Sequence, residues 1–407
     1  MHWRLLLICV SMVAFLFVGP TPARGQVTLG IDRLAERKFD LLQGKRVAVI
    51  TNHTGLTKDG THLIDLLIKN KINVVKLFSP EHGLYGTKDE HVADGIDDHT
   101  GLPVVSLYGD KSKRKPSKEQ LAGVDVMVFD IQDVGTRFYT YIATMGLCME
   151  ACAENNVEFV VLDRPNPIGG MRVDGPLNDA KHSGFTAYRR LPLVHGMTVG
   201  ELAQLFNTEF RINAKLTVVP MTGWSRSMYW DDTGVKWVNP SPNMRSPTQA
   251  VLYPAIGTVE STNISVGRGT DTPFELLGVP YVNGDEFAKA LTALKLPGIA
   301  FEPATWTPRN TPHPFNNQEC HGVRIKLTDR EVFQQALTGL SIAYTLHKLY
   351  PTDWQWQKAR SLIQNDDVFD RLFELPDLSN VAKLYAEPLE QWKEVRSHYL
   401  IYQEARK

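Results

Sequence analysis

Short runs of apolar and β-branched residues alternate with helical patterns through the first half of the chain, and this alternation constrains the fold more than any other feature. The predicted strands are 46–52, 73–78, 124–130, 157–162 and 216–221, with a short strand or edge piece at 104–108. The helical patterns are 62–71, 141–156 and 197–210. Strands that are apolar on both faces are typical of a parallel sheet covered by helices. The pattern predicts an α/β fold with a Rossmann-like, doubly wound, mainly parallel sheet.

The pattern changes near residue 239. Pro240, Pro242, Pro247 and Pro254 predict an irregular stretch, and a glycine-dotted loop is expected over 267–278. Beyond it we expect a strand at 323–327 and helices at 331–350 and 381–403. We therefore predict a Rossmann-like domain over 26–245 and a smaller α+β C-terminal domain over 246–407.

Residues 1–25 have the pattern of a secretory signal peptide. A basic start with Arg4 precedes an apolar run over 5–18, and small residues at Ala23 and Gly25 suit cleavage before Gln26. The apolar run is too short for a membrane span, which needs about 20 residues. We expect an exported protein, periplasmic or secreted, without a stable membrane anchor after cleavage.

Composition excludes several classes of protein. A net charge of −1 disfavours broad nucleic-acid binding, and four cysteines are too few for a disulfide framework. Cys148 and Cys152 are expected to pack inside a helix, and the basic cluster 111–115 to be a solvated loop or, alternatively, a weak contact for an anionic polymer. Dinucleotide, P-loop, nucleophile-elbow and zinc motifs are missing from the sequence, so no metal or organic cofactor is implied.

Polar side chains gather where the predicted strands end. They are Asn52 and His53, then Glu81 and His82, then Asp130, Gln132 and Asp133, then Asp163, Arg164 and Asn166. Ligands of open parallel sheets bind beyond the carboxyl ends of the strands, so we predict the site there. Paired carboxylates suit glycoside hydrolysis, and aromatic and amide groups suit sugars and N-acetyl groups.

Several segments together resemble a known family. They are 30–33, 50–55, 79–83, 100–103, 129–141, 162–167, 195–202, 240–244, 260–263, 267–270 and 396–402. The block at 129–141, F-D-I-Q-D-V-G-T-R-F-Y-T-Y, is long and specific. The sequence resembles the bacterial exo-β-N-acetylmuramidases of peptidoglycan, formerly a domain of unknown function. The resemblance implies removal of β-linked N-acetylmuramic acid from non-reducing ends of peptidoglycan fragments in cell-wall turnover, at a site between two domains.

Glu81 is the predicted general acid, because it follows a strand end and would be desolvated beneath a bound sugar. Glu260 is the first candidate for the second carboxylate, and Asp174 and Asp133 are rivals. Asp174 stands where the family pattern leads us to expect a glutamate, which shortens its reach. Asp130 and Asp163 are expected to be buried groups that orient arginines or loop amides.

The predicted substrate contacts have different tasks. Arg137 and Arg268 would grip the lactyl carboxylate, and Tyr139 would stack on the sugar. Histidines and asparagines would contact hydroxyl and N-acetyl groups. The full set is Asn52, His82, Asp133, Arg137, Tyr139, Arg164, Asn166, His195, Asn243, Asn263 and Arg268.

Two other functions fit the same residues. A β-N-acetylglucosaminidase would share the chemistry without needing a lactyl clamp, and an exported muropeptide-binding protein would share the cleft without turnover. The partner in each case is a peptidoglycan-derived glycan or muropeptide. Retaining, inverting and substrate-assisted mechanisms are all compatible with the sequence.

Overall fold

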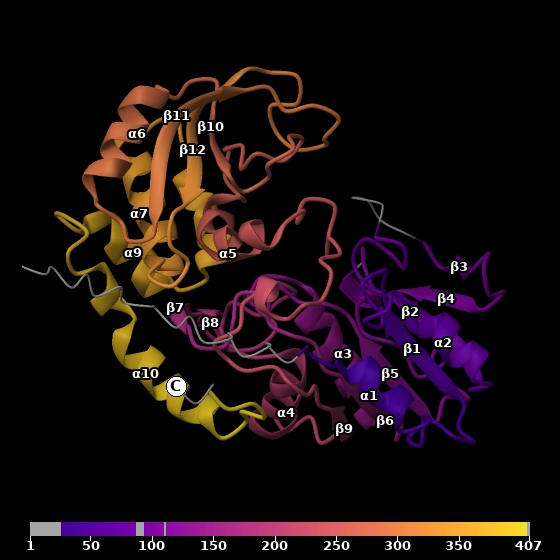
Figure 1. Cartoon of the computed structure of the whole chain (residues 1–407). Helices are drawn as coiled ribbons and strands as arrows, with labels where there is room; N and C mark the ends of the chain where they lie inside the picture. Colours follow the sequence, from indigo (N-terminus) through magenta and orange to yellow (C-terminus); the bar gives the residue numbers. More distant parts are fainter. Residues whose placement is uncertain (1–25, 87–92, 110, 405–407) are drawn as a thin grey trace, which may run out of the picture.

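The computed structural model describes residues 26–86, 93–109 and 111–404 (Figure 1). The predicted signal peptide, 1–25, lies outside the described residues. Along the part of the chain that is described, no helix is long and apolar enough to cross a membrane.

A seven-stranded sheet organises the first half of the chain, in the order β3-β4-β2-β1-β5-β6-β9. The strands are β1 (Val47–Thr51), β2 (Val74–Ser79), β3 (Gly95–Ile96), β4 (Pro103–Ser106), β5 (Val126–Asp130), β6 (Glu158–Leu162) and β9 (Lys215–Val219). All pairs are parallel except β3 with β4. The chain winds outward from β1 in one direction and from β5 in the other, which confirms the predicted doubly wound α/β fold.

Helices cover both faces of this sheet. In β1 the side chains of Val47 and Val49 pack in one apolar cluster with α1 and α2, while Ala48 and Ile50 pack in another with α3 and α4. The helices are α1 (Gly30–Glu36), α2 (Leu63–Lys69), α3 (Tyr141–Glu154) and α4 (Val199–Glu209). Strands buried on both faces explain the continuous apolar runs in the sequence.

A capping box marks the start of α4. The Thr198 hydroxyl accepts a hydrogen bond from the Glu201 amide at 3.3 Å, and the Glu201 carboxylate accepts one from the Thr198 amide at 3.0 Å. This capping box satisfies two amide groups that a helix start otherwise leaves without partners. Cys148 and Cys152 are buried within α3, as predicted.

The second half of the chain builds a smaller α+β unit around a three-stranded antiparallel sheet in the order β10-β12-β11. The strands are β10 (Leu276–Val279), β11 (Ile299–Trp306) and β12 (Cys320–Leu327). The helices are α5 (Pro247–Ile256), α6 (Gly284–Ala293), α7 (Gln335–Leu349), α8 (Arg360–Ile363), α9 (Asp366–Glu374) and α10 (Ala386–Ser397). The predicted domain boundary at 245 falls just before α5 and stays a prediction.

Two local predictions were wrong, and one hairpin was missed. The proline-rich stretch contains helix α5, because Ser246 caps its first turn and Pro247 occupies the first helical position, where a proline costs no hydrogen bond. Strand β10 begins inside the expected glycine loop. A short hairpin, β7 (Asp174–Leu177) with β8 (Pro192–Val194), was missed because each strand is only a few residues long.

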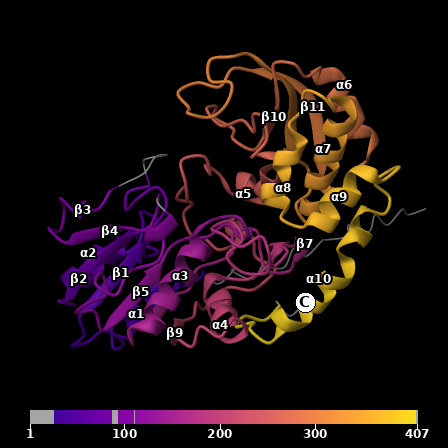
Figure 2. The same ribbon diagram turned by 180° about the vertical axis from the view of Figure 1, so that it is seen from behind.

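The C-terminal segment returns to the first domain. Figures 1 and 2 both show α10 running from the second domain to the vicinity of α4. Arg396, in the last turn of α10, donates to the carbonyl of Gly196 at 2.7 Å, and beyond the helix the Tyr402 hydroxyl donates to the Asp163 carboxylate at 2.5 Å. The last residues therefore fasten the second domain onto the first.

Candidate active site

A cavity of about 340 Å³ lies beyond the carboxyl ends of β2 and β5, which flank β1. This is the place where the winding direction of the sheet reverses, and reversals of this kind open a crevice. The wall of the cavity comprises Glu81, His82, Tyr108, Phe138, Tyr139, Thr140, Tyr141, Thr186, Ser241, Tyr253, Glu260, Arg268, His313 and Leu362. Residues of both domains therefore form it.

Glu81 enters this cavity from the loop after β2. The Thr140 hydroxyl, immediately before α3, donates a hydrogen bond to its carboxylate. The next residue, His82, has a positive backbone φ of 69° and also lines the cavity. The strand end and the helix start together fix the position of the Glu81 carboxylate.

Glu260 enters the same cavity from the second domain. It follows the short 3-10 helix η3 (Gly257–Val259) and forms an ion pair with Arg268. The Arg268 guanidinium also lies 5.3 Å from the centre of the Phe274 ring. A carboxylate from each domain and one arginine thus face a single cavity.

Aromatic rings complete the wall. Tyr139 and Tyr141 meet edge to face at 5.0 Å between ring centres, and Tyr253 lies 5.9 Å from Tyr139. Helix α3 begins at Tyr141, so Tyr139 lies in the loop before it, and both tyrosines line the cavity. Burial raises the pKa of Tyr139 and Tyr253, so their hydroxyls are neutral.

Arg164 and Asp130 form a buried pair. Arg164 donates from Nε at 2.5 Å and from Nη2 at 2.9 Å to the two Asp130 oxygens, and also to the carbonyl of Leu56. This placement supports Asp130 as an orienting group. It also corrects the expectation that Arg164 contacts the substrate. The Arg164 guanidinium is hydrogen-bonded within the protein and does not line the cavity of Glu81.

Arg137 is also placed differently from its predicted role. It is 1% exposed, and its guanidinium donates at 2.7–3.1 Å to four backbone carbonyls, of Pro176, Leu191, Leu362 and Ile363. Two carbonyls belong to each domain. Arg137 therefore links the domains and is not positioned to bind a substrate carboxylate.

Asp174 lies in β7, away from the cavity. Its carboxylate accepts a hydrogen bond from the Ala336 amide at 3.0 Å and one from the Tyr385 hydroxyl at 3.4 Å. Burial raises its pKa. The geometry gives Asp174 a structural task at the domain contact and corrects its candidacy as a catalytic carboxylate.

A second group of predicted contacts lies buried near the ends of β5 and β6. The Asp133 carboxylate accepts from the Gly135 amide at 2.7 Å and lies 3.6 Å from His195 Nε2, while Asn166 donates to the carbonyl of Met197. His195 is fully buried. These residues hold the loops that follow β5 and β6 in place. None of them lines the cavity, so the structure does not support direct substrate contact for them.

The remaining asparagines also fall outside the cavity wall. Asn52 is fully buried and accepts from the Thr54 amide at 2.9 Å, which shapes the loop after β1. Asn263 binds the backbone of Asp353 and Gln355. Asn243 lines a neighbouring hollow of about 800 Å³.

Sequence reasoning missed several polar and aromatic residues of the wall. Thr140, Ser241, Tyr253 and His313 were not among the candidates, although all line the cavity. Thr140 and Ser241 lie within segments already singled out for their resemblance, so those segments were a usable signal. Tyr253 belongs to the helix that we expected to be irregular.

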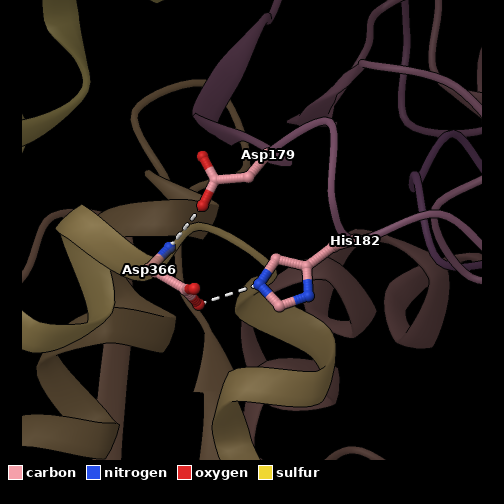
Figure 3. A group of neighbouring side chains, drawn as sticks. All are labelled: Asp179, His182 and Asp366. Atoms are coloured by element: carbon pink, nitrogen blue, oxygen red, sulfur yellow. Dashed lines mark hydrogen bonds and ion pairs between the residues drawn. The ribbon is translucent and has the colours of Figure 1, made fainter.

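One cluster has residue types that can bind metal ions, namely Asp179, His182 and Asp366 (Figure 3). Asp366 is already bound by His182 at 2.8 Å, by Arg360 at 2.8 Å and by Lys181. These partners lower its pKa. Two permanent cations at one carboxylate disfavour a metal ion, so the cluster is best explained as an ion network that joins the two domains.

Comparisons with known proteins agree with this architecture. The N-terminal family model of exo-β-N-acetylmuramidase NamZ matches residues 47–248, and the C-terminal model matches residues 251–402. A crystal structure of a DUF1343 family protein from Bacteroides fragilis NCTC 9343 has a TM-score of 0.84 and 33% identity, covering 93% of this chain and 99% of the other. A second protein of that family from the same strain has a TM-score of 0.77 and 32% identity, with the same coverage.

A curated relative extends the match to an enzyme of known activity. The peptidoglycan β-N-acetylmuramidase NamZ of Bacillus subtilis (strain 168) is 44% identical over 388 residues, which is 94% of this chain and 93% of the relative. Both halves of the chain and nearly its full length are therefore accounted for by one family. The chain belongs to the exo-β-N-acetylmuramidase NamZ family.

Proposed function

We propose that this protein is an exo-acting glycoside hydrolase that releases β-linked N-acetylmuramic acid from the non-reducing ends of peptidoglycan fragments. The observation that carries the proposal is the cavity in which Glu81 and Glu260, from different domains, face one space beside Arg268. Its volume, about 340 Å³, is at the lower end for small-molecule sites and suits one sugar residue. The family assignment and the Bacillus subtilis relative support the same reaction.

Glu81 serves as the general acid in this proposal. A carboxylic acid donates its proton to the glycosidic oxygen as the bond to the leaving sugar breaks. The Thr140 hydroxyl can donate or accept, so it keeps a hydrogen bond to Glu81 before and after the proton is transferred. The position of the acid is therefore maintained through the reaction.

Glu260 supplies the second carboxylate from the opposite domain. In glycoside hydrolysis such a group attacks the sugar carbon, activates water, or stabilises the positive charge that develops on the ring. In a substrate-assisted reaction the N-acetyl oxygen attacks instead, and Glu260 then has only the stabilising task.

Arg268 is the group that we assign to the lactyl carboxylate, the feature that distinguishes N-acetylmuramic acid from N-acetylglucosamine. Guanidinium grips carboxylate with paired N–H donors, which gives both strength and orientation. Since Arg268 also pairs with Glu260, binding of the lactyl group and placement of the second carboxylate are linked.

The decisive experiment compares the chromogenic β-glycosides of N-acetylmuramic acid and N-acetylglucosamine, using the mature protein and Glu81→Gln. We expect turnover of the muramic substrate only, and a loss of about 10³-fold in kcat for the variant with little change in binding, as general acid catalysis predicts. Glu374→Gln, an exposed glutamate at the end of α9, is the matched control.

Other outcomes would redirect the assignment. Equal turnover of both glycosides would show a broader N-acetylhexosaminidase and would contradict the assignment of Arg268 to the lactyl carboxylate. Tight binding of free N-acetylmuramic acid without turnover of either glycoside would show a binding protein. Full activity of Glu81→Gln would move the general acid to another residue.

We also propose that the protein is exported and loses residues 1–25. The basic start, the short apolar run and the small residues before Gln26 support cleavage there. Expression of the full chain in a bacterium, followed by fractionation and N-terminal sequencing, tests this directly. A mature protein that begins near Gln26 outside the cytoplasm is expected, and an intact N-terminus would overturn the proposal.

A further inference from the structure

A second groove opens beside the catalytic cavity. It has a volume of about 650 Å³ and shares four wall residues with that cavity, namely Glu81, Tyr108, Thr140 and Thr186. The two spaces are therefore continuous. The groove extends from Glu81 along the side of α3 toward Arg114.

Glu81 lies at the junction of the two spaces. A general acid must reach the oxygen of the bond that breaks, so the scissile bond crosses this junction. Arg268 and Glu260 line only the first cavity and mark it as the place of the muramic acid that is released. The leaving part of the glycan consequently extends into the groove.

The charges along the groove are not equivalent. Lys115 and Arg189 both bind Glu150, at 3.3 Å and 2.5 Å. Arg114 lies with its guanidinium 4.4 Å from the centre of the Phe185 ring. Among the residues that the structure describes, no carboxylate is paired with Arg114, and its buried Nε has no hydrogen-bond partner.

The groove also offers surfaces on which sugars can lie. Tyr108 and Phe185 form a tilted pair with ring centres 6.1 Å apart. The Arg114 guanidinium lies over the Phe185 ring. A carboxylate that binds beside the two rings would therefore contact a guanidinium that is already oriented. Arg114 belongs to the basic cluster 111–115, for which a contact with an anionic polymer was the alternative interpretation.

We propose that this groove binds the leaving part of the glycan and that Arg114 binds the lactyl carboxylate of the next muramic acid along the chain. N-acetylglucosamine and N-acetylmuramic acid alternate in the glycan, so the first leaving sugar is uncharged and the second carries the carboxylate. The inference rests on the proposed exo-muramidase function and assigns a second site of carboxylate recognition, separate from Arg268.

The test uses three peptide-free substrates: the chromogenic β-N-acetylmuramic acid glycoside, the disaccharide with a muramic acid at its non-reducing end, and the corresponding tetrasaccharide. Only the tetrasaccharide places a lactyl carboxylate in the groove. Arg114→Gln is expected to lower kcat/KM for the tetrasaccharide about tenfold, which corresponds to about 1.4 kcal/mol, and to leave the other two substrates unchanged. Lys113→Ala, which changes the exposed residue immediately before Arg114, is the matched control.

A tetrasaccharide whose inner muramic carboxyl is reduced to an alcohol completes the design. On this substrate the wild type and Arg114→Gln should have the same kcat/KM, because the interaction partner is missing. An equal loss on all substrates would show that Arg114 only supports the fold, and no loss on the tetrasaccharide would place the leaving glycan elsewhere. Failure of the wild type to hydrolyse even the chromogenic glycoside would instead overturn the proposed function itself.

Discussion

The Thr140 hydroxyl donates a hydrogen bond to the Glu81 carboxylate, and these two residues come from loops that follow different strands of the sheet. Glu81 follows β2, whereas Thr140 follows β5 and precedes α3. Since β1 lies between these strands, the bond connects the loops on either side of it. The position of the proposed acid therefore depends on the winding of the sheet as well as on its own loop.

Replacing Thr140 with valine should lower kcat about tenfold and leave KM nearly unchanged. Valine has a similar shape but cannot donate, and a hydrogen bond to a charged group contributes roughly 1.5 kcal/mol or more. Steady-state kinetics on the chromogenic muramic glycoside measure the effect. Thr140→Ser retains the hydroxyl and should restore most of the rate, so a serine variant as slow as the valine variant would contradict a positioning role.

Arg268→Lys should separate the contribution of the positive charge from that of the paired N–H donors in binding the lactyl carboxylate. Lysine can keep the ion pair with Glu260 but loses the paired donors of the guanidinium. We expect kcat/KM for the muramic glycoside to fall about 30-fold, which corresponds to roughly 2 kcal/mol for a charged hydrogen bond. Inhibition by free N-acetylmuramic acid should weaken by a similar factor.

Free N-acetylglucosamine provides the specificity control for this variant, because it lacks the lactyl group. Its weak inhibition should be the same for the wild type and Arg268→Lys. Equal weakening for both sugars would mean that Arg268 shapes the cavity without recognising the lactyl carboxylate. Arg371→Lys, on the exposed side of α9, should behave as the wild type.

The sheet could be predicted from the sequence because its signal is local. Each of β1, β5 and β6 is a continuous apolar run, and the alternation with helices fixes a parallel sheet. Helix α5 was not predicted because its prolines suggested an irregular stretch. Pro247, however, lies at the first helical position, where a helix tolerates proline. Hairpins as short as β7 with β8 have too few residues for a periodic signal.

The site was only partly predictable for a different reason. Glu81, Glu260 and Arg268 were selected from polar loops, and the fold brings them to one cavity. Arg137 was selected by the same argument, yet it is buried among carbonyls of both domains. A polar residue in a loop has the same sequence signal whether it faces a ligand or the backbone of another domain, and only tertiary contacts distinguish the two cases.

Arg137→Met should lower the free energy of unfolding by about 3–5 kcal/mol, because methionine leaves buried carbonyls without donors. The bonds to Leu362 and Ile363 reach the second domain, so separate unfolding of the two domains should become visible in the variant. Urea denaturation followed by circular dichroism measures the change. Arg190→Met, at an exposed position, should leave the free energy of unfolding nearly unchanged. An equally small effect of Arg137→Met would contradict the interpretation that Arg137 links the two domains.

Asp163→Asn should make the free energy of unfolding less dependent on pH between about pH 4 and 7. Burial raises the pKa of Asp163 from 3.8 to about 7, although hydrogen bonds from Tyr402, Gly200 and Thr198 oppose the shift. In this window the folded protein binds more protons at Asp163 than the unfolded chain does, so the contribution of Asp163 to stability is fully present below about pH 4 and is lost as the pH rises through about 7. Asparagine stays neutral and can still accept from the Gly200 amide, so its free energy of unfolding should lack this decline. Urea unfolding at several pH values measures the difference, with Asp98→Asn as an exposed control; parallel pH profiles for the wild type and Asp163→Asn would show that Asp163 ionises alike in both states.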